Sequence, residues 1–125
     1  MIIQIEPQSD IPIFTQLTNQ IIEGIARGAM QSGDSLPSVR ALAADLGVNM
    51  HTVNKSYHEL EKKGIIRIIP KSGAVINFPK EMTGYTNRLL EEFKPMIAEA
   101  LVLGLEREQI QDLVSSIIGD LKGKT

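Results

Sequence analysis

The chain has 125 residues, a hydrophobic fraction of 42% and a formal net charge of −2, values typical of a small globular protein. This length allows one compact domain, or a small domain with a short appended element, and excludes a second large domain. The absence of cysteine excludes disulfides, cysteine-ligated zinc and thiol chemistry, and an aromatic fraction of 4% argues against binding by stacking on nucleic-acid bases.

Neither an export signal nor a membrane span is evident in the sequence. The first seven residues, Met1–Pro7, contain no basic leader and no cleavage site, and no apolar run approaches the length that a bilayer requires. We therefore expect a cytoplasmic protein that has no contact with membranes.

The first predicted helix begins near Asp10 or Pro12. Asp10 is a candidate N-cap, and Pro12 is tolerated in a first turn because its missing N–H would be unpaired there anyway. The apolar residues that follow recur at helical spacing and predict one broad buried face: Ile13, Phe14, Leu17, Ile21, Ile22, Ile25 and Ala26.

A short second helix and a longer third helix follow. Residues 33–37 predict a turn, and Ser38 can cap a second helix that ends at Gly47. Asn49 is placed to cap a third helix over residues 50–63.

The third predicted helix has one buried side and one free side. Val53, Tyr57 and Leu60 are spaced by four and three residues and must face the core. Other side chains therefore lie to the side or on the opposite face, where a partner can reach them: Met50, His51, Asn54, Lys55 and His58.

A β-hairpin follows the third helix. Residues 65–69 form a β-branched run that predicts a strand, residues 70–73 supply a turn, and residues 74–77 return. A two-stranded hairpin is marginal alone, so it must pack on the helices. Two helices joined by a tight turn and followed by such a wing place one helix in the DNA major groove while the hairpin grips the adjacent backbone.

The sequence beyond Pro79 predicts two amphipathic helices. In the first, apolar positions alternate between spacings of three and four residues: Thr86, Leu89, Phe93, Met96, Ala100 and Leu103, widened by Leu90, Ile97 and Leu101. After Gly104, acidic residues suit the start of a second helix with its own apolar face: Ile110, Leu113, Val114, Ile117, Ile118 and Leu121. Pro95 predicts a kink or a break between Glu91 and Pro95.

These two apolar stripes are wider than one neighbour in the same chain would cover. Burial within one chain is the alternative, but a homodimer that packs the helices against their copies is the economical arrangement. The predicted dimer interface contains Leu89, Leu90, Phe93, Met96, Ile97, Ala100, Leu103, Ile110, Leu113, Val114 and Ile117.

Charge is distributed unevenly along the chain. Residues 35–77 carry six basic and three acidic side chains, whereas residues 1–34 carry one and four, and residues 78–125 carry six and eight. A local basic face neutralises phosphates and releases counterions. The middle of the chain is therefore the candidate contact with DNA, and a solvated surface with chance asymmetry is the alternative interpretation.

Ordered motifs span this basic region: Pro12-Ile13-Phe14-x-Gln16-Leu17, Gly33-Asp34-x-Leu36-Pro37-Ser38-x-Arg40-x-Leu42-Ala43, Leu46-Gly47-Val48-Asn49, Thr52-Val53 and Leu60-Glu61-x-x-Gly64. Together they resemble the DNA-binding domain of GntR-family bacterial transcription regulators. The short two-helix tail resembles the YtrA-like subfamily. The resemblance implies a mostly α fold with a small β-hairpin, formed by a winged helix-turn-helix DNA-binding domain over residues 1–78 and a helical dimerisation region over residues 79–125.

The resemblance also implies roles for individual residues. In the family, the Arg of the Pro-Ser-x-Arg segment binds DNA, the start of the third helix reads bases, and the wing tip reaches the minor groove. In this sequence the corresponding residues are Ser38, Arg40, Asn49, Met50, His51, Thr52, Asn54, Lys55, Lys71, Ser72 and Gly73. Many relatives carry basic residues where this chain has Met50 and Asn54.

Several of these residues have two interpretations. Arg40 and Lys71 are either ordinary surface cations or phosphate contacts. Asn54 is either solvated or paired with adenine, and Met50 either fills space or contacts a thymine methyl group. His51 and His58 lie on one helical face, but without an acidic cluster beside them we expect no metal ion, and we expect no cofactor.

The predicted function is a sequence-specific transcription regulator, acting as a repressor, that binds an inverted-repeat operator in double-stranded DNA as a homodimer. A small-molecule effector stays open as a further partner. The alternative is a winged-helix module that binds another protein, for which DNA association would be weak and insensitive to salt. Catalysis is not expected, because no paired carboxylates, activated nucleophile or phosphate-binding glycine loop is evident.

Overall fold

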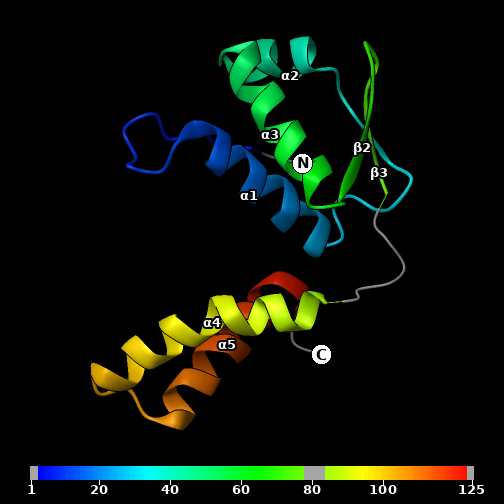
Figure 1. Ribbon diagram of the computed structural model, residues 1–125. Helices are drawn as coiled ribbons and strands as arrows, with labels where there is room; N and C mark the ends of the chain where they lie inside the picture. Colours follow the sequence, from blue (N-terminus) through cyan, green and yellow to red (C-terminus); the bar gives the residue numbers. More distant parts are fainter. Residues whose placement is uncertain (1–2, 78–83, 124–125) are drawn as a thin grey trace. The chain divides into compact units, whose positions relative to one another are not determined.

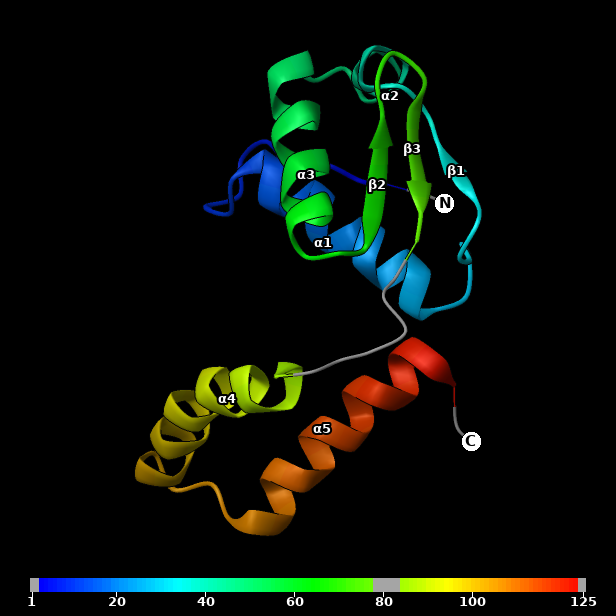
Figure 2. The ribbon, with the colours of Figure 1, turned by 45° about the vertical axis from the view of Figure 1, so that its right-hand side comes forward.

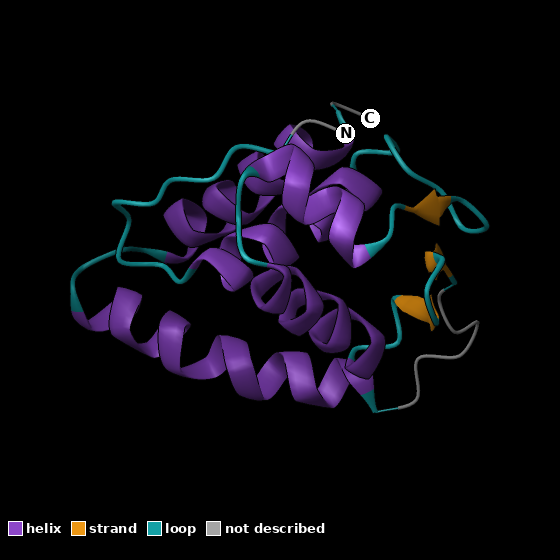
Figure 3. Ribbon diagram, turned by 90° about the horizontal axis from the view of Figure 1, so that it is seen from above, coloured by secondary structure: helices purple, strands orange, loops and turns teal. Residues whose placement is uncertain are grey.

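The computed structural model describes residues 3–77 and 84–123 of the chain. Contacts divide it into two compact units (Figure 1): Met1–Pro79, here called the winged-helix unit, and Lys80–Thr125, here called the tail unit. Helices dominate both units, and the described strands lie in the winged-helix unit (Figure 3). The predicted fold class, mostly α with a small β element, is confirmed.

The winged-helix unit contains three helices and three strands in the described residues. In chain order these elements are α1 (Ile13–Ala26), β1 (Ser35–Leu36), α2 (Val39–Leu46), α3 (Met50–Lys62), β2 (Ile66–Ile69) and β3 (Gly73–Ile76). Both α1 and α2 pack on α3, and β2 continues from it. Aliphatic side chains and one tyrosine form the core: Leu17, Ile21, Met30, Leu36, Leu42, Ala43, Val53, Tyr57, Leu60, Ile66, Ala74 and Ile76.

The first helix begins without the cap that the sequence predicted. Pro12 occupies the N-cap position of α1, and no side chain caps the helix, so the assignment of Asp10 as its cap was wrong. Pro12 instead begins the helix with its own carbonyl, which accepts hydrogen bonds from the N–H groups of Thr15 and Gln16, each at 3.0 Å. Proline suits this place because it has no N–H to leave unpaired.

Two glutamines of α1 hold the N-terminal segment against the helix. The Gln20 side chain accepts from the Gln4 N–H at 2.9 Å and donates to the Gln4 carbonyl at 2.7 Å. Gln16 pairs in the same way with Glu6, at 2.8 and 3.0 Å. These amides satisfy the backbone as a neighbouring strand would, while Ile3 packs on the core from the same segment. The segment is thereby ordered without belonging to the sheet (Figure 2).

The sheet has three antiparallel strands in the order β1-β3-β2, so the predicted two-stranded hairpin was incomplete. The additional strand, β1, pairs Ser35 with Val75 and Leu36 with Ala74 inside a segment that we had interpreted as a turn. Gly73 permits this pairing, because a Cβ at that position would lie 2.3 Å from the Leu36 carbonyl oxygen. A two-residue strand is too short to show a periodic pattern, so the sequence alone did not reveal it.

The tail unit consists of α4 (Tyr85–Val102) and α5 (Arg107–Lys122). Pro95 lies inside a continuous α4, so the helix is not broken there, and a kink near Pro95 stays a prediction. Proline removes one hydrogen bond and strains one turn, which a long helix tolerates when the ring is exposed. Glu106 forms a capping box with Gln109 at the start of α5. From the sequence we predicted only that acidic residues favour a helix start here, and not the capping box.

Neither helix of the tail unit has a buried residue. The half-buried apolar side chains are Leu89, Ile97 and Ala100 on α4, Leu105 in the loop, and Ile110 and Leu121 on α5. Most large apolar side chains are exposed, and Leu103 is 77% and Ile117 is 59% exposed. Neither of these helices, nor any other described helix, is long and apolar enough to cross a membrane.

Candidate nucleic-acid interface

The elements that carry the predicted DNA contacts lie at one end of the winged-helix unit. Figures 1 and 2 both show α2, the N-terminal end of α3 and the tip of the β2–β3 hairpin at this end. The predicted contacts are thus brought together from residues 38–40, 49–55 and 71–73. Three separate chain segments form one surface, as the helix-turn-helix and wing interpretation requires.

Side-chain caps determine where α2 and α3 begin. The Ser38 hydroxyl oxygen accepts from the Ala41 N–H at 3.1 Å, and the Asn49 side-chain oxygen accepts from the His51 N–H at 2.7 Å. Both predicted caps are therefore confirmed. Arg40 consequently lies in the first turn of α2, where its side chain is exposed.

Three hydrogen bonds fix the rotation of α3 about its own axis. Ser56 and Thr18 pair their buried hydroxyl groups at 2.8 Å and join α3 to α1. The Tyr57 hydroxyl donates to the Pro37 carbonyl at 2.7 Å, which ties α3 to the segment before α2. The Glu61 carboxylate accepts from the Ile68 N–H of β2 at 2.8 Å. Because these bonds point to three different elements, α3 cannot turn its free face toward the core.

Tyr57 is the largest of the fully buried side chains in the core. It has no exposed surface, and burial raises the pKa of its hydroxyl to about 12. The hydroxyl therefore stays protonated and keeps donating to Pro37 throughout the physiological range. Sequence reasoning placed Tyr57 in the core but missed this bond, which spans 20 residues and has no local signal.

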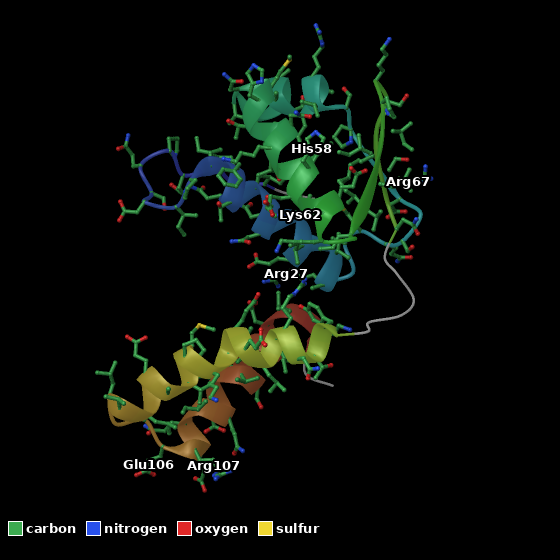
Figure 4. All side chains as sticks on the ribbon, in the orientation of Figure 1. Arg27, His58, Lys62, Arg67, Glu106 and Arg107 are labelled. Atoms are coloured by element: carbon green, nitrogen blue, oxygen red, sulfur yellow. The ribbon has the colours of Figure 1, made fainter. Side chains whose placement is uncertain are left out.

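The free face of α3 is largely as predicted. Met50 is 45% exposed, and four polar or basic side chains are exposed with it, namely His51, Asn54, Lys55 and His58, whereas Thr52 is half-buried. Figure 4 shows His58 and Lys62 following one another along α3, away from the end that holds α2 and the hairpin tip. The N-terminal part of the face is therefore the part closest to the other candidate contacts.

Lys55 makes a contact that the sequence did not suggest. Its ammonium nitrogen lies 4.0 Å from the centroid of the Phe14 ring of α1, a cation–π geometry. Phe14 had been assigned only to the buried face of α1, but its ring is half-buried and accessible from α3. In this conformation Lys55 lies against α1 rather than extending from the free face.

The hairpin tip presents one cation in a strained conformation. The Ser72 N–H bonds to the Ile69 carbonyl at 3.0 Å, so Pro70 and Lys71 are the central residues of a tight turn. Lys71 has a φ of 68°, a value that favours glycine. Lys71 and Ser72 are exposed, but Gly73 is buried against β1. Gly73 therefore shapes the wing through its packing on β1, and its predicted contact with DNA stays a prediction.

The described residues offer no group of three or more His, Cys, Asp or Glu side chains arranged to hold a metal ion. His51 and His58 are both exposed on α3, which is compatible with a polar contact to DNA or water. Positive charge in residues 35–77 comes from Arg40, Lys55, Lys62, Lys63, Arg67 and Lys71. Of the nearby acids, Glu61 is already engaged by the β2 backbone.

The chain segments that form this surface also match a known protein family. Residues 14–76 match the family described as "Bacterial regulatory proteins, gntR family", a stretch that contains α1 to β3 apart from the first residue of α1. The chain belongs to the GntR family. This assignment confirms the resemblance seen in the sequence motifs, and the names of its relatives are those of regulators rather than enzymes.

The similarity extends beyond the DNA-binding segment. The HTH-type transcriptional repressor YtrA of Bacillus subtilis (strain 168) is 38% identical over 124 residues, covering 97% of this chain and 95% of the repressor. A structure described as a transcriptional antiterminator from Listeria monocytogenes EGD-e has a TM-score of 0.88 at 28% identity, covering 99% and 95%. YtrA from Sulfolobus acidocaldarius, a GntR-family transcription factor, has a TM-score of 0.62 at 34% identity, covering 95% and 98%. The tail unit thus has counterparts in these relatives.

Proposed function

We propose that this GntR-family transcription regulator binds an inverted-repeat operator as a homodimer and represses transcription from it. In this proposal each winged-helix unit occupies one half-site, with α3 in the major groove and the hairpin tip beside the adjacent backbone. The observation that carries the proposal is the exposed face of α3, whose N-terminal part lies at the same end of the unit as α2 and the tip of the β2–β3 hairpin.

The proposed contacts divide into positioning and reading groups. Arg40 and Lys71 contact phosphates, and Ser38 and Asn49 hold the two helix starts near the backbone. Met50, His51 and Asn54 face the base edges from the first turns of α3, and Thr52 supports them from a half-buried position. Ser72 accompanies Lys71 at the hairpin tip. Lys55 contributes charge beside α1.

Support for the homodimer comes from the tail unit. Its two helices bury no residue, although the tail unit carries eleven of the exposed large apolar side chains of the described chain, among them Leu90, Phe93, Met96 and Val114. An apolar surface of this extent is typical of an interface. A second copy is the simplest partner, because twofold symmetry lets the same stripe cover itself and places two recognition helices on one face of DNA.

Selection from a random DNA pool with the full-length protein tests the proposal. We expect an inverted repeat to be enriched and the logarithm of the affinity to fall linearly with the logarithm of salt concentration. The variant Arg40→Glu with Lys71→Glu should lose binding. Lys94→Glu with Arg107→Glu, which makes the same charge change on exposed residues of the tail unit, should retain it. Weak, salt-insensitive association without an enriched sequence would favour the protein-binding alternative.

A further inference from the structure

The free face of α3 contains a line of side chains suited to one kind of base pair. Met50, Asn54 and His58 are spaced by four residues, which places them one above another along the helix. Met50 and Asn54 are about 6 Å apart along the axis, less than two base-pair steps of about 3.4 Å. These two residues lie in the first five positions of α3, the part that a recognition helix directs at base edges.

The cations that usually pair with guanine are missing from this line. α3 contains no arginine, and its lysines are Lys55 and Lys62. Lys55 lies over the Phe14 ring, and Lys62 is the last residue of the helix. A bidentate donor for guanine O6 and N7 is therefore absent where α3 approaches the bases.

Asn54 offers the complementary chemistry. A carboxamide donates to adenine N7 and accepts from adenine N6–H, so a single asparagine makes both bonds at one base edge. The Asn54 side chain is exposed and α3 is held in rotation by Ser56, Tyr57 and Glu61, so the amide is presented in a defined direction. Next to it, the Met50 thioether is an apolar, adaptable surface for a thymine methyl group.

We propose that Asn54 reads an adenine in each half-site and that Met50 packs on the methyl group of a thymine at the same or a neighbouring base pair. The inference rests on the proposed DNA-binding function and adds the identity of the bases. It makes Asn54 a specificity-determining residue, and it makes the centre of the half-site A·T rather than G·C.

Parallel selections from one random pool, using the full-length wild type, Asn54→Ala, Asn54→Arg and the control Asn19→Ala, test this inference. Asn19 is an exposed asparagine of α1, so the control removes the same amide from the same unit away from the bases. We expect the wild type and the control to select adenine at the same position of the half-site. Asn54→Ala should show no base preference at that position, and Asn54→Arg should select guanine there.

A second measurement isolates the contact itself. Replacing the selected adenine with 7-deazaadenine removes N7. This change should weaken DNA binding by the wild type about 5- to 150-fold and leave the affinity of Asn54→Ala unchanged. An inverted repeat whose half-site is invariant G·C throughout, or an unchanged selection with Asn54→Ala, would overturn the inference while the proposed function stands. Failure of the wild type to enrich any sequence would overturn both.

Discussion

The winged-helix unit and the tail unit solve the problem of burying apolar surface in opposite ways. In the first, Leu17, Ile21, Val53 and Leu60 have no exposed surface at all. In the second, both helices are amphipathic as well, but none of their apolar side chains is more than half-buried. The first unit encloses a core of its own, whereas the second leaves most of its large apolar side chains exposed. The comparison teaches that amphipathic periodicity predicts a helix and its apolar face but does not say what covers that face.

The difference also suits a division of labour. A closed unit keeps α3 in a fixed orientation through Ser56, Tyr57 and Glu61, which DNA recognition requires. An open helical pair with exposed apolar stripes can join two such units and set the spacing of their recognition helices.

The largest effect is expected in the tail unit. Leu89→Asp combined with Phe93→Asp places two charges in the proposed interface and should convert the dimer to a 13.8 kDa monomer in sedimentation experiments. Because two linked half-sites bind far more tightly than one, operator affinity should fall by about 100-fold or more. Ser115→Asp with Ser116→Asp adds the same charge outside the apolar stripe of α5 and is the control. An intact dimer in the first variant would place the interface elsewhere.

Truncation of a leucine should change the stability of the two units in different ways. Leu17→Ala empties part of a closed core and should lower the free energy of unfolding by about 2–5 kcal/mol at every protein concentration. Leu113→Ala removes a side chain that is 54% exposed, so its effect should appear as a weaker dimer and depend on concentration. Urea titrations at two protein concentrations measure both effects. Equal, concentration-independent losses would contradict the contrast between the units.

Alkaline pH should destabilise the winged-helix unit through Tyr57. Its folded-state pKa of about 12 exceeds the ordinary value of 10.0, so the unfolded chain loses this proton first. The contribution is complete below pH 10, and stability falls as pH rises from 10 to 12, by at most about 3 kcal/mol. Tyr57→Phe should remove this component of the pH dependence, and Tyr85→Phe in α4 is the matched substitution. Denaturant unfolding between pH 9 and 12 distinguishes them.

The salt dependence of DNA binding should locate the phosphate contacts in one unit. Each phosphate contact contributes about 0.9 to the slope of log affinity against log salt, so Arg40→Ala should lower the slope by about 2 for a dimer and about 1 for a monomer. The fold should be intact because the Arg40 side chain is exposed. Arg107→Ala in α5 should leave the slope unchanged. An unaltered slope for Arg40→Ala would reject its assignment.

The smallest effect concerns backbone strain at the wing tip. Within residues 3–77 and 84–123, Lys71 is the residue that combines a side chain with a positive φ, whereas the tail unit uses glycine at such positions. Lys71→Gly and Lys71→Ala both remove the charge and should weaken DNA binding equally. The glycine variant should be more stable than the alanine variant by about 1 kcal/mol. The reason is that the Cβ of alanine makes the left-handed backbone conformation unfavourable, whereas glycine has no Cβ. Thermal unfolding compares them, and equal stability would mean that the turn relaxes.

Local sequence signals predicted most of the elements and the caps that place the site. Ser38 and Asn49 cap the helices that they were expected to cap, and the spacing of Val53, Tyr57 and Leu60 identified the free face of α3. These features depend on residues within one or two turns of each other, so the pattern is visible along the chain. The strand β1 was missed because a tertiary pairing outweighed a local preference for a turn, and the Asp10 cap was wrong because Pro12 occupies the N-cap position of α1.

Local patterns in the chain were enough to identify the helices, the two strands of the hairpin, the apolar side of each helix, and the excess of positive charge between residues 35 and 77. Three contacts became visible only in the folded molecule: Gln16 and Gln20 hold the N-terminal segment, Lys55 lies over Phe14, and Gly73 is buried against β1. The physical reason is that these contacts join residues between 10 and 41 positions apart, whose proximity depends on how whole elements pack and leaves no periodic trace in the chain.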